Sequence, residues 1–486
     1  GAATVHLGAP GVSTYTTISA QMDSILFNND ATILQSQSNL GTTASRPQAW
    51  AKNIVSVGGV YHFDNANWND DRWQNGASTG PAADGRIKPE LSNAYDSGTT
   101  TYTTTTSGYA LFSGTSQATP ITAGLFGVMY QVWGQGFFGN TCLGSSYFAN
   151  RPKASVCKAI MVNTARLYDT TINIDTTRVR QGWGTANLQN LWDLRNNMFI
   201  VNETDVLTNL QTKTYKLYVP AGTPALKATM CYTDPAGKVG AAVTRLNNLS
   251  LKVTSPAGVV YWGNNGMGTT SNWSTAGGTE NTVDTTENVF VQSPGAGTWT
   301  VEVFGSDINT DARPETVGTI DADFGLVVSG VSYSVLPASY TAQGGTYVSG
   351  GLNELARSDN AALVQTETTD GDTVDASRFL IVSATSPVAS LSQWGLTFEG
   401  KTGVALGKAK IEGWNWTTNA WELLGDVSVP GTDTANTFVI NTSASRFVNA
   451  TTREMRARIT YRDDDTGSEN QWFAQTDMIR FLVNPL

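Results

Sequence analysis

A serine at the start of a long apolar segment constrains this chain more than any other feature of its sequence. Residues 112–120 read Phe-Ser-Gly-Thr-Ser-Gln-Ala-Thr-Pro and lead into an apolar run, 121–132, that predicts a helix buried on all sides. Ser116 would lie in the first helical turn, where free N–H groups and the helix dipole favour a developing oxyanion. A serine or threonine at this position is also an ordinary helix cap, so the position alone leaves both interpretations open.

Periodicity divides the chain into one α/β segment and two β segments. Strand-like and helix-like runs alternate over residues 1–200, which is typical of an α/β fold with a mostly parallel sheet. After residue 200 the helical pattern ends, and short strand-like runs follow between Gly, Pro and Asn turns. We therefore expect an α/β domain at 1–200, a β-sandwich or jelly-roll domain at 201–334 and a C-terminal β-sandwich domain at 335–486.

Composition excludes some partners and favours a compartment. Thirty Lys and Arg against forty Asp and Glu leave a net charge of −10, which disfavours a nucleic-acid partner. No stretch approaches the ~20 apolar residues that a membrane span requires, so no span is expected. Scarce lysine and abundant Thr, Asn and Gly suit a secreted, extracellular protein. Of the three cysteines, Cys142 and Cys157 could close a loop as a disulfide, or they could, with Cys231, be inert buried thiols.

Further segments resemble the subtilisin-like serine proteases, the subtilases, and occur in that family's order. The motif Gly-Thr-Ser-x-Ala-x-Pro at 114–120 resembles the nucleophile motif of the family. The other matches are VHLGAPG at 5–11, TILQSQSNLG at 32–41, AKNIVSVG at 51–58, ADGRIKPE at 83–90 and QGWG at 181–184. The resemblance implies that residues 1–200 are the C-terminal half of a subtilisin-like parallel-sheet domain.

The same resemblance assigns roles to individual residues. It implies that Ser116 is the nucleophile and that Asn39, together with the Ser116 N–H, donates to the oxyanion. It also implies two strand edges and one turn that contact a substrate peptide. These substrate-binding residues are Leu7, Gly8 and Ala9, then Ser36, Gln37 and Ser38, and finally Gly114 and Thr115. No residue is assigned to a metal.

The chain departs from the family pattern in two ways that matter for chemistry. Subtilisin carries its catalytic residues in the order Asp, His, Ser, and the first two motifs would lie upstream of Gly1. Neither His6 nor His62 stands in a His-Gly-Thr-His context, and His62 is expected to be a plain loop residue. The expected partner is therefore an N-terminal fragment of the same precursor that carries the Asp and the His. The polar run at 35–38, Gln-Ser-Gln-Ser, predicts altered packing or a polar specificity pocket.

The two β segments indicate additional domains, and they leave open whether the chain binds calcium and whether its tryptophans bind a sugar. Residues 201–334 resemble the jelly roll that follows the catalytic domain in one subtilase subgroup. Asn248 and Ser250 stand where that subgroup has aspartates, which removes anionic calcium ligands; structural calcium elsewhere stays open, and no other cofactor is expected. Trp414, Trp416 and Trp421 could stack on a sugar, but cross-strand packing is the favoured interpretation.

The resulting expectation is a serine endopeptidase acting on protein or peptide substrates. This chain would bear the nucleophile of a secreted subtilisin-like enzyme and be inactive alone, because a serine without an adjacent base is a poor nucleophile. The alternative is a proteolytically inactive extracellular binding or structural protein that keeps the subtilase-like fold. The missing Asp and His motifs and the polar 35–38 segment motivate this alternative.

Overall fold

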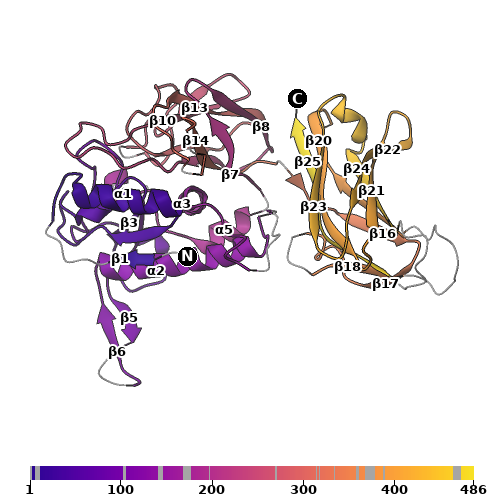
Figure 1. Cartoon of the computed structure of the whole chain (residues 1–486). Helices are drawn as coiled ribbons and strands as arrows, with labels where there is room; N and C mark the ends of the chain where they lie inside the picture. The colour runs from indigo at the N-terminus through magenta and orange to yellow at the C-terminus, as the bar shows by residue number, and fades with distance from the viewer. Residues whose placement is uncertain are drawn as a thin grey trace. The chain divides into compact units, whose positions relative to one another are not determined.

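The structure, a computed structural model, is mostly β-sheet with few helices (Figure 1). It describes residues 3–5, 11–101, 106–138, 140, 146–167, 177–195, 197–268, 271–313, 315–316, 318–332, 334–356, 361–366, 378–386, 389–463 and 472–485. The chain forms two compact units. The first comprises Gly1–Tyr130, Pro152–Tyr215 and Ala221–Val331, and the second comprises Gln131–Arg151, Lys216–Pro220 and Ser332–Leu486.

A four-stranded parallel sheet with the order β1-β2-β3-β4 organises the N-terminal part of the first unit. Its strands are β1 (Ala3–Val5), β2 (Ile33–Ser36), β3 (Val55–Val60) and β4 (Leu91–Ala94). Every residue of β3 is buried, as expected for an inner strand that is covered on both faces. β1 lies at the edge of the described sheet and pairs only with β2 among the described strands.

Helices surround this sheet and follow the apolar periodicity of the sequence. They are α1 (Thr17–Asn29), α2 (Thr115–Gly134), α3 (Ala154–Asn163), α4 (Arg178–Gln181) and α5 (Leu188–Leu194), with 3₁₀ turns η1 (Pro47–Trp50) and η2 (Trp68–Asp70). Helix α1 buries Met22 and Leu26, and its C-cap residue, Asp30, takes a left-handed conformation with φ 44°. None of the described helices is long and apolar enough to span a bilayer.

An antiparallel hairpin leads directly into α2. Its strands, β5 (Gly98–Thr101) and β6 (Tyr109–Phe112), project away from the sheet and its helices (Figure 1). Tyr109 and Leu111 are largely exposed on it. Because β6 ends only a few residues before Ser116, the hairpin connects to the turn that carries this serine.

The rest of the first unit consists of two four-stranded sheets, β12-β9-β14-β7 and β11-β10-β13-β8. The strands are β7 (Met198–Leu207), β8 (Thr212–Val219), β9 (Ala225–Cys231), β10 (Asn248–Thr254), β11 (Val260–Trp262), β12 (Thr286–Gln292), β13 (Gly297–Asp307) and β14 (Ala322–Ser329). Strand β7 crosses the boundary predicted at residue 200 and pairs with β14 along its length. Helix α3 joins the first of these sheets through Asn163, whose Nδ2 donates to the carbonyl oxygens of Lys227 and Val327.

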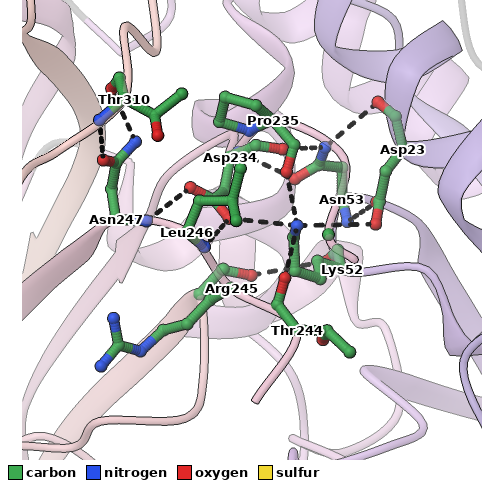
Figure 2. A network of polar contacts seen from close by, with 12 residues as sticks. Asp23, Lys52, Asn53, Asp234, Pro235, Thr244, Arg245, Leu246, Asn247 and Thr310 are labelled. Atoms are coloured by element: carbon green, nitrogen blue, oxygen red, sulfur yellow. Dashed lines mark hydrogen bonds and ion pairs between the residues drawn. The ribbon is translucent and has the colours of Figure 1, made fainter. Parts of the chain in front are cut away.

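A buried ionic cluster connects the α/β part of this unit to its β part (Figure 2). The Lys52 ammonium lies 3.1 Å from the Asp234 carboxylate and 3.8 Å from that of Asp23, and all three side chains are buried. Lys52 also donates to the carbonyl oxygens of Pro235 and Thr244. A buried charge is costly unless it is paired and hydrogen-bonded, so this cluster fixes the loop before β3 against the loop after β9.

The second unit contains two mostly antiparallel sheets that share one apolar core. One has the order β17-β18-β25-β20-β23, with β15 paired to β25, and the other has the order β16-β19-β24-β21-β22. The strands are β15 (Ser334–Val335), β16 (Ser339–Gln343), β17 (Thr346–Ser349), β18 (Leu363–Thr366), β19 (Arg378–Thr385), β20 (Leu391–Thr402), β21 (Gly407–Asn415), β22 (Ala420–Ser428), β23 (Thr434–Ile440), β24 (Glu454–Asp463) and β25 (Phe473–Pro485), with η3 at Ala444–Phe447. Alternate residues of β24, such as Met455 and Ile459, face this core as their period-2 pattern predicts.

Candidate active site

The turn before α2 is shaped by a glycine. Gly114 has φ +100°, a region that side chains disfavour, and its carbonyl oxygen accepts from the N–H groups of Gln117 and Ala118 at 2.9 and 3.2 Å. A Cβ at this position would lie 2.9 Å from Asn39 Nδ2. The absence of a side chain therefore lets Asn39 approach the helix start, and Ser116 lies in the first turn, half-buried.

Asn39 follows β2 and is held by the first residue of α2. Its Oδ1 accepts from the Thr115 N–H at 2.8 Å and from the Thr115 hydroxyl at 2.9 Å. Thr115 itself is fully buried, which makes it a rigid anchor. With Oδ1 engaged, Asn39 Nδ2 faces outward as a donor, and it bonds to no other residue that the structure describes.

Asn39 and Ser116 line the same cavity, which has a volume of about 190 Å³. The described residues around it are Gly11, Ser36, Ser38, Asn39, Leu40, Arg46, Thr115 and Ser116. The structure thus brings together a hydroxyl at a helix N-terminus and an amide donor that the sequence placed 77 positions apart. A carbonyl bound between them would meet the positive end of the helix dipole.

The predicted 36–38 strand edge is only partly correct. Ser36 and Ser38 line the cavity, but the side chain of Gln37 is fully buried and is not part of the cavity lining. The physical reason is the alternation of side chains along an extended chain. The backbone is also engaged, because Gln37 N–H donates to Val57 and the Ser38 carbonyl accepts from Ser78. These groups therefore cannot pair with a substrate strand.

The other predicted substrate strand and one histidine lie outside the described residues. These are Leu7, Gly8 and Ala9, together with His6. The remaining predicted residues, Gly114 and Thr115, form the turn and the anchor described above.

His62 was expected to be a plain loop residue, but the structure pairs it with a carboxylate. His62 Nδ1 lies 2.6 Å from Asp96 Oδ1, and Asp96 also accepts from the N–H groups of His62 and Phe63. Burial acts to raise the pKa of Asp96, but the bonds from His62 outweigh it and lower that pKa. His62 is not one of the residues lining the cavity. No local signal in the sequence connects positions 34 residues apart, so only the fold reveals this pair.

Helix α2 is not buried on all sides, contrary to the expectation from its composition. Pro120, Ile121, Gly124 and Val128 form an exposed stripe along one face, with Ile121 40% and Val128 43% exposed. A Cβ at Gly124 would meet no atom within 4 Å. The apolar face of a helix is normally covered by another element of the protein. Neither this stripe of α2 nor the open edge of β1 has such a partner among the described residues.

The segment matching ADGRIKPE is a structural network rather than a site. Glu90 accepts from the Ser56 N–H and hydroxyl and is ion-paired with Lys88 and Lys158. Burial and the neighbouring Lys158 lower the pKa of Lys88 to about 8, although Glu90 opposes this. The pKa of Glu90 is also lowered, because the two lysines outweigh its burial. Two buried ammonium groups therefore share one carboxylate.

The two cysteines in the described part of the chain are not among the residues that line the cavity. Cys157 and Cys231 are free, buried thiols, whereas Cys142, the other half of the alternative disulfide, lies outside the described residues. Burial raises the pKa of Cys157 to about 12 and that of Cys231 to about 11. Within the described ranges, no three His, Cys, Asp or Glu side chains gather as metal ligands.

The tryptophans of the second unit pack against each other. Trp414 and Trp421 are paired across β21 and β22 with ring centroids 5.2 Å apart, edge to face, and Trp414 is 6.2 Å from Trp416. Arg456 stacks over Trp416 and Arg458 over Trp421. This arrangement fits cross-strand packing better than a flat platform for a sugar.

A parallel sheet, a serine at a helix N-terminus and an amide donor across a small cavity are features found in the α/β class of serine-hydrolase sites. Comparison with known proteins narrows this class. The sequence model of the subtilase family matches residues 11–184. The resemblance to the subtilases is therefore confirmed for this segment, whereas the jelly-roll assignment of 201–334 stays a prediction.

Curated proteins similar to this chain are described as serine proteases. The serine protease/ABC transporter B family protein tagA of Dictyostelium discoideum is 28% identical over 200 residues, which cover 36% of this chain and 11% of the relative. Protein tagD of the same organism and description is 24% identical over 258 residues, 41% of this chain and 14% of the relative. This chain thus spans little more than a tenth of the length of the relatives it matches. The relatives and the family match support a peptidase-type function.

Among solved structures, similar chains include the prenylagaramide maturation protease PagA and the PatG macrocyclase in complex with peptide. PagA has a TM-score of 0.30 and 13% identity, covering 39% of this chain and 60% of its own. PatG has a TM-score of 0.31 and 14% identity, covering 39% of this chain and 50% of its own.

Proposed function

We propose that this chain is the nucleophile-bearing part of a secreted subtilisin-like serine endopeptidase. The observation that carries the proposal is the shared cavity of Ser116 and Asn39, with Asn39 held by Thr115 so that its Nδ2 is free to donate. In the assembled enzyme, the Ser116 hydroxyl attacks the carbonyl carbon of a peptide bond. Asn39 Nδ2 and the Ser116 N–H then stabilise the tetrahedral oxyanion.

The base and its carboxylate come from an N-terminal portion of the same precursor. A serine hydroxyl needs an adjacent imidazole to act at neutral pH, and His62, already bonded to Asp96, does not line the cavity. The exposed stripe of α2 and the open edge of β1 support this partner, since an additional strand and helix would cover both. In that assembly the upstream His takes the Ser116 proton, and the upstream Asp orients the His.

An active-site probe tests the proposal. An alkyl fluorophosphonate is incubated with the native preparation, with any companion polypeptide retained, and the labelled residue is located by peptide mass analysis. We expect labelling at Ser116 and none in Ser116→Ala. Asn39→Ala is expected to slow turnover by roughly 10²–10³-fold, a range measured for the corresponding donor of subtilisin itself. Failure of Ser116 to label would overturn the proposal.

The second candidate is a proteolytically inactive extracellular binding or structural protein. One observation favours it: the described lining of the cavity contains no histidine. Under this alternative the native preparation contains one chain, and Ser116 is unreactive towards the probe. The same experiment therefore separates the two candidates.

A further inference from the structure

The wall of the cavity beside Ser116 is polar and carries one cation. Ser36 and Ser38 lie on β2 and the residues after it, and Arg46 lies on the loop that follows Asn39. None of the described lining residues is acidic. The cavity is thus an electropositive pocket that is continuous with the Ser116 hydroxyl and the Asn39 amide.

Arg46 is firmly placed by its backbone. Its N–H donates to the Ser38 hydroxyl at 3.2 Å, and its carbonyl accepts from the Ala49 N–H at 3.0 Å. Pro47, which follows it, begins the fully buried 3₁₀ turn η1. The preceding residue is also anchored, because the buried Ser45 hydroxyl donates to the Gln37 carbonyl. The base of the Arg46 side chain is therefore held at the pocket by a rigid loop.

The guanidinium of Arg46, in contrast, has no partner among the described residues. No hydrogen bond, ion pair or ring contact joins its side chain to them, and the residue is half-buried. Other half-buried or buried arginines of this unit are paired, as Arg86 is with Asp84 and Arg166 with Asp71. The guanidinium of a half-buried arginine that lines the same cavity as two serines presents a fork of donors that matches a carboxylate.

Building on the function proposed above, we propose that Arg46 makes this site selective for an acidic residue immediately before the scissile bond. When Ser116 attacks that residue's carbonyl carbon and Asn39 holds its oxygen, the residue's own side chain enters the adjoining pocket. The cavity of about 190 Å³ is smaller than the ~300–1,000 Å³ of typical drug-sized ligand sites, so it suits one side chain. An aspartate or glutamate carboxylate there would pair with Arg46 and accept from Ser36 or Ser38.

Peptide phosphonate probes test this selectivity on the native preparation. Three tetrapeptide diphenyl phosphonates are compared that differ only in the residue next to phosphorus: glutamate, phenylalanine or lysine. We expect the glutamate probe to label Ser116 at least about tenfold faster than the other two, the effect of one charge-assisted hydrogen bond. Arg46→Gln should abolish this preference, Arg46→Lys should keep part of it, and Arg46→Glu should favour the lysine probe.

Two controls keep the outcome interpretable. The matched variant Arg195→Gln, at the end of α5 and outside the cavity, should leave the selectivity unchanged. The non-peptidic fluorophosphonate measures the reactivity of Ser116 independently of the pocket. If this reagent labels Ser116 but the glutamate probe shows no advantage in the wild type, the selectivity proposal is overturned and the peptidase proposal stands. If no reagent labels Ser116, both are overturned.

Discussion

The side-chain oxygen of Asn39 accepts two hydrogen bonds from Thr115, one from its N–H and one from its hydroxyl. This pairing fixes which end of the amide faces the cavity, because only Nδ2 remains to donate. The residue next to the nucleophile therefore orients the oxyanion donor.

Replacing the hydroxyl tests this orientation. Thr115→Val removes one of the two bonds and keeps the N–H bond, so Asn39 loses about 0.5–1.5 kcal/mol of restraint. We expect fluorophosphonate labelling of Ser116 to slow by roughly two- to tenfold. The melting temperature serves as the control for folding, because Thr115 is buried. A labelling rate equal to that of the wild type would show that the hydroxyl does not position Asn39.

Ser38 has an unusual backbone conformation for a residue with a side chain, with φ +83°. Glycine adopts this region without the ~1–2 kcal/mol strain that other residues incur. Both Ser38→Gly and Ser38→Ala lose the bond from the Arg46 N–H, but only the glycine variant relieves the strain. We therefore expect Ser38→Gly to be more stable than Ser38→Ala by about 1 kcal/mol in urea unfolding. The opposite order would contradict the strained conformation.

Lys88 should make stability depend on pH. The folded chain releases its proton near pH 8, whereas an unfolded lysine holds its proton to about 10.5. Between these values the unfolded state binds more protons, so rising pH favours folding by up to about 1.4 kcal/mol per unit from this group. Unfolding free energies at pH 7.5, 8.5 and 9.5 should therefore diverge between wild type and Lys88→Met. Lys238→Met, at an exposed lysine, is the control. If the difference in unfolding free energy between wild type and Lys88→Met were the same at all three pH values, the lowered pKa of Lys88 would be refuted.

The exposed stripe of α2 should bind the proposed N-terminal portion. Val128→Asp leaves the fold of this chain intact, because Val128 is 43% exposed, but it places a charge in the proposed interface. Titration calorimetry with the separately produced N-terminal portion should show at least tenfold weaker binding. Val439→Asp on β23 is matched in exposure at 42% and should bind like the wild type. Equal binding by both variants would place the interface elsewhere.

Strongly patterned segments were predictable from the sequence, and weakly patterned ones were not. The run Leu226–Cys231 has the apolar residues and flanking turns that predict a strand locally, and it lies within β9. Strand β7 lacks such a local signal, because it begins just after α5 and its polar residues 202–205 obscure the alternation. It is paired along β14, a tertiary contact that local propensity does not contain.

The same distinction applies to the residues of the candidate site: those in a recognisable motif were predictable from the sequence, and the others were not. Ser116 and Asn39 were predicted as site residues because each stands in a recognisable motif, and the fold brings them to one cavity. Arg46 lies in a loop without periodicity, so only the cavity identifies it. Gln37 was misplaced because the motif did not say which side chains of an alternating strand face the pocket. Whether α2 is buried on all sides depends on which other elements cover it, and the composition of the helix does not contain this information.

The most direct test of the account is intact-mass analysis of the native preparation combined with fluorophosphonate labelling. We expect two polypeptides, one being this chain with a single adduct on Ser116 and the other carrying an Asp motif and a His motif. His62→Gln should label as the wild type does. A preparation that contains this chain alone, with Ser116 unlabelled, would contradict the account.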